Sequence, residues 1–411
     1  MRSLEARLAW RNVWRNPRRT ALTVAATVFA VVLVVFFVAM AAGVHEKMIE
    51  DSVRVSSGHV TLTGEDYLEK RTLEQFLRLR PELAQRLDET PGVVGYAPRV
   101  ISFGLLSHDS ATKGVAVLGV DPLREGRVTT LSERVREGSF LKPGARREIV
   151  LGERLARNLN AEVGDELLLY SFAYSLESAY ELFRVTGIIK LPEPRIDRSL
   201  AAISLADAQE FFVYGDRVSE IAILTEDDDS SSALVSALES ALAGDGVVEV
   251  HSWREVMPEL VQLIFLDDAG MYIMLVILIV VVGFGILNTI LMTVLERKRE
   301  FGVVLALGLR PGSVFRIVYL ESMALALLGL VIGLAIGIPL VLYFQAHPIA
   351  LTGDVVEAVE LFGVEPVMTW KLKPLNPIGS AITILAVAVV AALYPALKAS
   401  HGRPVDVLRS L

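Results

Sequence analysis

The chain contains no cysteine among its 411 residues. This excludes a disulfide framework, a thiolate metal site, a cysteine nucleophile and a lipid-modified cysteine. Aromatic residues are also scarce, at 7%, although 53% of all residues are hydrophobic. The hydrophobic excess is therefore aliphatic, and a mean hydropathy of +0.48 is high for a soluble protein, whose surface must be wetted. This composition predicts an integral membrane protein.

Sequence motifs for catalysis are missing as well. The sequence has no G-x-x-x-x-G-K-[ST] phosphate-binding loop and no G-x-S-x-G nucleophile motif. Its six histidines show none of the i,i+3 or i,i+4 pairs that hold a metal ion on a helix. We therefore expect a chain that is not an enzyme and that has no catalytic residue, no metal site and no cofactor of its own.

Four hydrophobic stretches are long enough to cross a membrane, which takes about 20 apolar residues in a helix. Three of them, at 21–43, 269–295 and 375–397, contain no charged residue, and the fourth, at 317–344, contains only Glu321. The alternative for the first stretch is a cleaved signal peptide, which its long apolar run disfavours. The predicted parts, in order, are an amphipathic helix at 1–20, spans at 21–43, 271–295, 314–345 and 376–398, a large domain with stalk helices at 44–270, a short loop at 296–313, a second loop at 346–375 and a tail at 399–411.

The charges around these spans predict the orientation of the chain. The N-terminal segment, the short loop after the second span and the C-terminal tail together carry 14 basic and 4 acidic residues. Residues 44–270 carry 24 basic and 39 acidic residues. Because short basic segments stay in the cytoplasm, both termini and the 296–313 loop are expected there. The large domain is then extracytoplasmic, and the amphipathic helix lies on the inner membrane surface.

The large domain is predicted to be α+β, with two similar β-α-β units at its ends. The first unit has a strand at 58–63, a helix at 81–89 and a strand at 93–107. The second has a strand at 219–225, a helix from the cluster at 227–232 to residue 243, and a strand at 247–251. We expect the two units to pair around a part richer in strands. Within that part, residues 191–198, with two prolines, are expected to form an exposed connection.

The 296–313 loop contains a short apolar helix between charged ends. Residues 301–307 are apolar or glycine, and Gly308 and Pro311 are expected to stop the helix. An exposed apolar helix needs either a groove in a partner protein or the lipid interface to cover it, and its shortness favours a partner. Phe301, Val304 and Leu305 are expected to form the covered face, because i, i+3 and i+4 point the same way.

Two features of the third span concern packing. Gly329, Gly333 and Gly337 lie four residues apart on one helix face, so another helix can approach closely. We interpret this face as packing within the subunit; dimerisation is the alternative. Glu321 lies about one turn inside the span, and we expect an arginine or lysine partner, or a side chain reaching the headgroups, in preference to a transport role.

Several motifs in this sequence resemble those of FtsX-like ABC transporter permeases, a family with lipoprotein-releasing (Lol-type) and macrolide-exporter (Mac-type) membrane subunits. The resemblance covers the whole chain in the same order. Its motifs are Leu-Ala-Trp-Arg-Asn-Val-Trp-Arg-Asn-Pro-Arg-Arg-Thr at 8–20, Gly-Glu-Arg-Leu-Ala at 152–156, Val-Gly-Asp at 163–165, Phe-Arg-Val-Thr-Gly at 183–187, Glu-Arg-Lys-Arg-Glu-Phe-Gly at 296–302 and Tyr-Pro-Ala-Leu-Lys-Ala-Ser at 394–400.

The resemblance implies a permease subunit that pairs with a second, identical or homologous permease and with two copies of an ATPase subunit, which binds Mg-ATP. It also implies a porter-like extracytoplasmic domain, location in the inner membrane, and a periplasmic carrier or adaptor as a further partner; no nucleic acid is expected. The 296–313 loop would be the coupling helix, with these coupling residues: Arg299, Glu300, Phe301, Gly302, Val304, Leu305 and Gly308.

For the substrate, the resemblance favours a lipoprotein or lipid-like amphiphile, because residues 195–209 are more similar to lipoprotein-releasing subunits than to macrolide exporters. The first span carries Phe29, Leu33, Phe36 and Met40 on one face, which would suit acyl chains or, equally, bulk lipid. Two alternatives stay open: a transmitter that activates a periplasmic partner such as a cell-wall hydrolase without transport, and a permease for antibiotic or peptide efflux.

Overall fold

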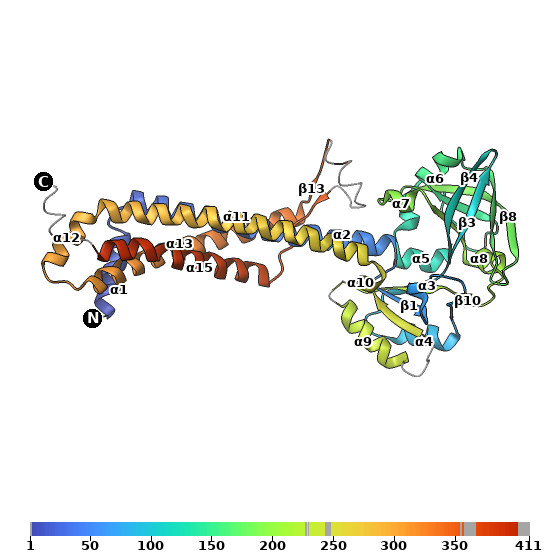
Figure 1. Ribbon diagram of the computed structural model, residues 1–411, viewed down its shortest axis with the longest axis horizontal. Helices are drawn as coiled ribbons and strands as arrows, with labels where there is room; N and C mark the ends of the chain where they lie inside the picture. Colours follow the sequence, from blue (N-terminus) through green and yellow to red (C-terminus); the bar gives the residue numbers. More distant parts are fainter. Residues whose placement is uncertain are drawn as a thin grey trace. The chain divides into compact units, whose positions relative to one another are not determined.

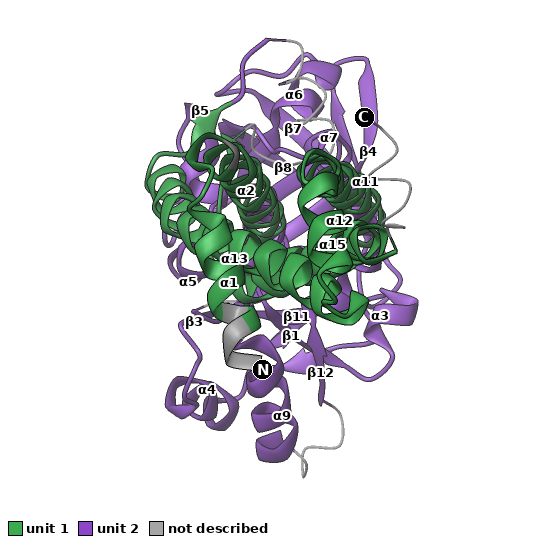
Figure 2. Ribbon diagram, turned by 90° about the vertical axis from the view of Figure 1, so that its left-hand side faces the viewer, with its two compact units in different colours: residues 1–46, 264–350, 367–411 green, residues 47–263, 351–366 purple. Residues whose placement is uncertain are grey.

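The computed structural model describes residues 2–226, 228, 230–242, 248–353, 356 and 367–401, and it divides into two compact units (Figure 2). Unit 1 contains residues 1–46, 264–350 and 367–411, and unit 2 contains residues 47–263 and 351–366. The predicted tail beyond residue 401, residue 247 of the last predicted strand and much of the predicted 346–375 loop lie outside the described residues.

Unit 1 is a helical bundle (Figure 1). Within the described residues, four helices are long and apolar enough to cross a membrane, which confirms the predicted number of spans. The elements of unit 1 are α1 (Arg2–Val13), α2 (Pro17–Val55), α11 (Pro258–Glu296), α12 (Lys298–Ala306), α13 (Pro311–Ala346), β13 (Ile349–Ala350), β14 (Val367–Met368) and α15 (Leu375–Ser400). The helices α2 and α11 continue past the ends of the bundle and contribute residues to unit 2 as well.

Local sequence explains where the helices of unit 1 break. Proline cannot continue a helix, so α1 ends before Asn16-Pro17 and Pro17 begins α2. Gly308 has φ +93°, a left-handed conformation that suits glycine, and it lies just beyond the end of α12. Pro311 then occupies the first turn of α13, where a missing N–H is harmless. Two long helices are thereby joined by a short, separately oriented one.

Unit 2 is built on one mixed sheet with helices packed against it. In chain order its elements are β1 (Val60–Gly64), α3 (Tyr67–Lys70), β2 (Leu77–Arg78), α4 (Pro81–Glu89), β3 (Gly95–His108), β4 (Ala111–Val120), α5 (Pro122–Val128), a 3-10 turn (Leu131–Arg134), β5 (Val135–Gly138), β6 (Glu148–Gly152), α6 (Glu153–Leu159), β7 (Glu166–Phe172), β8 (Ser178–Ile189), α7 (Pro194–Asp197), β9 (Leu200–Ser204), α8 (Leu205–Phe211), β10 (Arg217–Val218), β11 (Glu220–Leu224), α9 (Ser231–Leu242), β12 (Val248–Ser252) and α10 (Trp253–Val256).

The two predicted β-α-β units interleave in this sheet. Its strand order is β12-β1-β11-β3-β4-β9-β6-β8-β5, and β7 pairs with β3 and β8. Strand β1 of the first unit lies between β11 and β12 of the second, and β11 lies between β1 and β3, all antiparallel. The helices α4 and α9 supply Leu83, Leu87, Leu234 and Leu238 to the hydrophobic core beneath these strands. Strands from the two ends of the domain therefore share one core.

The 191–198 segment differs from its expected form. It is a connection, but Leu191, Pro194 and Asp197 are buried, and Pro194–Asp197 forms the short helix α7. The Asp197 carboxylate accepts hydrogen bonds from the backbone N–H groups of Glu153 at 3.2 Å, Arg154 at 3.0 Å and Leu191 at 3.0 Å. The first two of these N–H groups belong to the first turn of α6, where a carboxylate is favourable. The prediction of an exposed segment therefore holds for Arg195 and Arg198 but is wrong for Asp197, whose carboxylate is buried against the start of α6.

One buried arginine joins several elements of unit 2. Arg99 on β3 contacts Glu125 on α5, with Nη2–Oε1 at 2.6 Å and Nε–Oε2 at 3.1 Å, and Glu220 on β11, with Nη1–Oε1 at 3.2 Å. It also donates to the backbone oxygen of Ser56, which follows α2. The three side chains are only 3%, 1% and 7% exposed. We call Arg99, Glu125 and Glu220 the Arg99 cluster.

Candidate functional site

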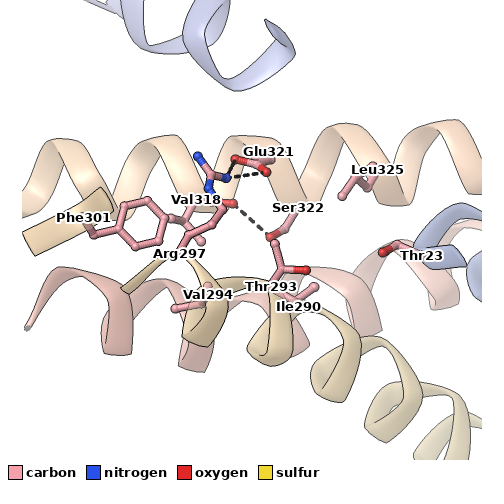
Figure 3. Close-up of a pocket in the computed structure, with 10 residues that line it drawn as sticks. All are labelled: Thr23, Ile290, Thr293, Val294, Arg297, Phe301, Val318, Glu321, Ser322 and Leu325. Atoms are coloured by element: carbon pink, nitrogen blue, oxygen red, sulfur yellow. Dashed lines mark hydrogen bonds and ion pairs between the residues drawn. The ribbon is translucent and has the colours of Figure 1, made fainter. Parts of the chain in front are cut away.

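The strongest candidate site is a polar cluster at the α12 end of unit 1. It comprises Asn12 near the end of α1, Arg15 in the turn after α1, Arg297 and Glu300 at the start of α12, and Glu321 on α13. We call these five residues the α12 junction. Arg297 stands in the one-residue break between α11 and α12, with φ −95° and ψ 10°. This break directs its guanidinium toward α13 instead of along α11 (Figure 3).

The central contact of the α12 junction is an ion pair between Arg297 and Glu321. Arg297 Nη1 lies 2.9 Å from each carboxylate oxygen of Glu321, and the side chains are 12% and 11% exposed. An unpaired carboxylate at this depth would be costly, so the pair explains how α13 tolerates Glu321. The expected basic partner of Glu321 is therefore Arg297.

Glu300 links this pair to α1. Its carboxylate lies 3.2 Å from Arg297 Nε, and its two oxygens lie 3.0 Å and 3.1 Å from the terminal nitrogens of Arg15. Burial opposes ionisation, but the hydrogen bonds and charges of Arg297 and Arg15 outweigh it and lower the pKa of Glu300. Asn12 donates a long hydrogen bond, 3.4 Å, to Glu321. Side chains from α1, α12 and α13 are thus held by one chain of charges.

Phe301 lies beside the α12 junction in a hydrophobic cluster and is only 9% exposed. It packs with Val294, Val314, Val318, Ala396 and Ala399, from α11, α13 and α15. The Arg297 guanidinium carbon lies 5.1 Å from the centre of the Phe301 ring, a cation–π contact. Packing of Phe301 against three other helices of the same chain thus fixes the position of α12.

This packing corrects the expected docking face. Phe301 and Gly302 are buried within the chain, and Leu305 is half-buried beside them, so they do not form the free face of α12. The exposed apolar residues are Val303, Val304 and Leu307, the last 83% exposed, with Arg299 and Gly308 also exposed. The pattern identified an amphipathic helix, but the chain's own helices cover the side that was assigned to a partner.

A small hollow of about 20 Å³, partly open to solvent, adjoins the ion pair. Figure 3 shows Arg297 and Glu321 pointing toward each other above Thr293 and Val294, with Thr23 on a separate helix. The lining residues come from α2, α11, α12 and α13: Thr23, Ile290, Thr293, Val294, Arg297, Phe301, Val318, Glu321, Ser322 and Leu325. The charged pair therefore has room for about one water molecule beside it.

The predicted acyl-binding stripe on α2 does not lie on one free surface. Phe29 is exposed, whereas Leu33 and Met40 are half-buried. Phe36 lies in an aromatic group with Phe344, at 5.4 Å between ring centres, and Trp370, at 5.2 Å. The half of the stripe that contains Phe36 is thus covered by other parts of the same chain.

The three glycines of α13 pack against α2 of the same subunit. A Cβ at Gly329 would lie 2.5 Å from Thr27 Cβ, and one at Gly333 would lie 2.6 Å from Val31 Cβ. At Gly337 the nearest atom, Val32 Cα, would be 3.5 Å away, an ordinary contact. The structure therefore shows packing within the subunit, and the contact is tightest at the first two glycines.

A second candidate surface lies on unit 2. Alternate residues of three adjoining strands are large, apolar and exposed: Phe103 and Leu105 on β3, Leu168 and Phe172 on β7, and Tyr180 and Leu182 on β8. Leu168 lies directly opposite Leu182 in the β7–β8 pairing. The intervening residues Leu106, Leu167, Leu169 and Phe183 fill the core on the other side. We call the exposed set the β3–β7–β8 face; such a large apolar patch indicates an interaction surface.

Sequence reasoning missed Asn12, Arg15 and Arg297 as partners in one site. The motif at 8–20 contained Asn12 and Arg15, and the motif at 296–302 contained Arg297, but no local spacing connects positions almost 300 residues apart. The β3–β7–β8 face could have been read from alternation at 168–172 and 180–182.

Two family models match the chain, one described as the MacB-like periplasmic core domain over residues 20–241 and one as the FtsX-like permease C-terminal over residues 272–404. Among curated proteins, the chain is 25% identical to the lipoprotein-releasing system transmembrane protein LolC of Neisseria meningitidis serogroup B, over 77% of this chain and 78% of that protein. It is 26% identical to LolE of Haemophilus influenzae, with 80% of each chain covered.

A shorter similarity, 31% identity, joins 32% of this chain to 18% of the macrolide export ATP-binding/permease protein MacB of Chromobacterium violaceum. Among solved structures, the periplasmic region of MacB from Actinobacillus actinomycetemcomitans aligns with 50% of this chain and 94% of its own, at 15% identity and a TM-score of 0.35.

Proposed function

The chain belongs to the FtsX-like ABC permease family, and from this premise we propose that it couples ATP hydrolysis by a separate ATPase subunit to the extraction or export of a lipoprotein or lipid-like amphiphile. The substrate would leave the outer leaflet of the inner membrane. As an ABC transporter permease of the Lol/Mac type, the chain contributes membrane helices and an extracytoplasmic domain. The Mg-ATP would be bound by the ATPase subunit, of which two copies would serve a pair of permeases.

The observation that carries the coupling role is the arrangement of α12. One side of this helix is anchored to α11, α13 and α15 through Phe301, and its charged start is tied to α1 and α13 through the α12 junction. The opposite side presents Val303, Val304 and Leu307. A helix held firmly on one side and apolar on the other can pass a push from a bound protein into the bundle.

We expect Leu307→Asp to weaken binding of the ATPase subunit, because a carboxylate would enter the apolar contact. Leu123→Asp is a matched control: Leu123 is another exposed leucine, on α5 of unit 2. Copurification of the ATPase subunit with each variant measures the effect. Equal recovery with both variants, at wild-type level, would show that the exposed side of α12 does not dock the ATPase.

The orientation proposal places both termini and α12 in the cytoplasm and unit 2 outside. Its support is the charge difference, 14 basic and 4 acidic residues in the short flanks against 24 basic and 39 acidic residues at 44–270. A reporter active only outside the cytoplasm should work when fused after Asp228 and fail when fused after Pro311. Activity at Pro311 would reverse the assignment.

A lipoprotein or similar amphiphile is favoured because similarity to lipoprotein-releasing proteins spans most of the chain, whereas similarity to the macrolide exporter covers about a third. The β3–β7–β8 face supports an extracytoplasmic carrier or adaptor as a further partner, since water otherwise contacts six large apolar side chains. Mass spectrometry of molecules copurified with the intact complex tests the substrate class. Recovery of a macrolide or peptide, without acylated molecules, would favour efflux.

A further inference from the structure

A short segment between β14 and α15 crosses the outer half of α2. It consists of Thr369, Trp370, Lys371 and Leu372, and we call it the 369–372 strap. Trp370 is only 4% exposed, and its ring centre lies 5.2 Å from that of Phe36 and 5.0 Å from that of Phe344. Leu372 packs against the same hydrophobic cluster, which also includes the half-buried Met40. The strap therefore fills the space over Phe36.

Helix α2 is shaped to receive the strap. Gly43 has no side chain, and a Cβ built on it would lie 2.4 Å from Thr369 O and 2.6 Å from Trp370 Cα. Both are backbone atoms, so no side-chain rotation could relieve the contact. The Lys371 N–H donates to Ala39 O at 2.9 Å, one helical turn from Gly43. Any residue larger than glycine at position 43 would require the strap to move.

The strap contains buried polar groups that make no hydrogen bond. Trp370 Nε1 and Thr369 Oγ1 are buried and have no hydrogen-bond partner. Buried indole N–H groups normally find a partner, and an unmade hydrogen bond destabilises the buried state. The ion pair between Lys371 Nζ and Glu46 Oε1, at 2.8 Å, is partly exposed and therefore weak. Apolar packing of the Trp370 ring is the main attraction, and a similar apolar group could replace it.

We propose that Trp370 stands in for an acyl chain on α2 and that a bound amphiphile displaces the 369–372 strap. This inference rests on the proposed function, which places an acylated substrate on the outer half of the first span. The strap would keep the apolar surface of Phe36 and Phe344 covered when no substrate is present. Displacement would release the unpaired Trp370 N–H and Thr369 hydroxyl to water or to the ester and amide oxygens of the substrate.

The test compares Gly43→Ala with Gly285→Ala in the assembled complex, in detergent. A Cβ at Gly285 on α11 would have no atom within 4 Å, so this control adds the same methyl group without a clash. The probe is a synthetic diacylated lipopeptide carrying a fluorophore on its peptide. With Trp10, Trp14 and Trp253 replaced by phenylalanine, Trp370 emission reports the position of the strap.

In Gly43→Ala we expect Trp370 emission to shift to the red and lipopeptide affinity to rise several-fold, because binding no longer has to open the strap. Gly285→Ala should match the parent in both measurements. Since Gly43→Ala could disturb assembly, Trp370→Ala provides a second variant, in which affinity should also rise. Conversely, a short bismaleimide that cross-links the double variant Glu46→Cys, Lys371→Cys should hold the strap in place and reduce lipopeptide affinity. The chain has no cysteine of its own that could react instead.

Two outcomes overturn the inference in distinguishable ways. If the parent binds the lipopeptide but Gly43→Ala and Trp370→Ala bind it no better, the strap does not compete with acyl chains and the proposed function stands. If neither the parent nor any variant binds the lipopeptide, the acylated substrate itself is wrong, and the inference fails together with that part of the proposed function.

Discussion

The Arg99 cluster of unit 2 and the α12 junction of unit 1 each contain an arginine that contacts two glutamates, and they differ in their surroundings. In each, a single arginine holds two glutamates: Arg99 holds Glu125 and Glu220, and Arg297 holds Glu300 and Glu321. All members of the Arg99 cluster are nearly inaccessible, whereas Glu300 is 43% exposed and a hollow adjoins Arg297. The same arrangement of charges is thus enclosed in unit 2 and partly exposed in unit 1.

This difference indicates different roles. A fully enclosed ion cluster is costly to break and tolerates one geometry, so it fixes β3, α5 and β11 together. A cluster with an exposed member and free space beside it can exchange partners at lower cost. We infer that the Arg99 cluster maintains the fold of unit 2, and that the α12 junction permits α12 to shift.

The largest expected effect comes from breaking the enclosed cluster. Arg99→Met leaves the buried carboxylates of Glu125 and Glu220 without their common partner, so the free energy of unfolding of unit 2 should fall by about 3–5 kcal/mol. Trp253, buried in unit 2, can report this unfolding once the other three tryptophans are phenylalanine. A loss below about 1 kcal/mol would contradict the structural role of the cluster.

The next effect concerns the ion pair between Arg297 and Glu321 in the α12 junction. Glu321→Leu leaves Arg297 with Glu300 as its remaining partner, so we expect a smaller loss of stability, about 1–3 kcal/mol. Adding Arg297→Met should restore part of this loss, because an apolar pair fits the apolar surroundings. The thermal midpoint of the complex in detergent measures both changes. Restored stability without restored substrate-stimulated ATP hydrolysis would separate coupling from folding.

A third prediction uses pH to distinguish the clusters. Burial raises the pKa of Glu220, despite the opposing charge of Arg99. The folded state then binds a proton more tightly than the unfolded state, so the stability of unit 2 should decrease as pH rises from 4.5 through the raised pKa. The Glu220→Gln variant should lack this decrease of stability with pH. An unchanged slope would assign the titration to another group.

The smallest expected effect is on the exposed member of the α12 junction. Glu300→Gln removes the charge that joins Arg15 to Arg297, but surface ion pairs contribute at most about 1 kcal/mol. Stability should therefore hardly change, while the coupling of substrate binding to ATP hydrolysis weakens. Lys113→Gln, on β4 of unit 2, is a control for loss of one exposed charge. A large loss of stability in Glu300→Gln would make the two clusters equivalent.

Local sequence patterns predicted those helices and strands that a few neighbouring residues specify. The helix at Pro81–Glu89 was predicted with its observed bounds, because a proline at the first turn marks its start. Strands β4 and β9 were missed: β9 is buried along its whole length, and its run Leu-Ala-Ala-Ile-Ser shows no alternation.

The candidate site was less predictable than the fold, for a physical reason. The apolar pattern of α12 identifies which residues share a face, but not whether the chain or a partner covers that face. Phe301 is covered by α13 and α15, which reach it only through tertiary packing. The pairing of Arg297 with Glu321 depends on the angle between α11 and α12, and a one-residue break at Arg297 sets that angle.

The glycine contact between α13 and α2 has a consequence for how related chains can diverge. Thr27 and Val31 occupy the volume that side chains at 329 and 333 would otherwise fill. The sum of the two side-chain volumes at each contact is therefore limited, whichever helix supplies it. In an alignment of relatives, a residue larger than glycine at 329 should occur together with glycine or alanine at 27. These two columns should therefore vary together, while each column alone shows only a moderate restriction in side-chain size.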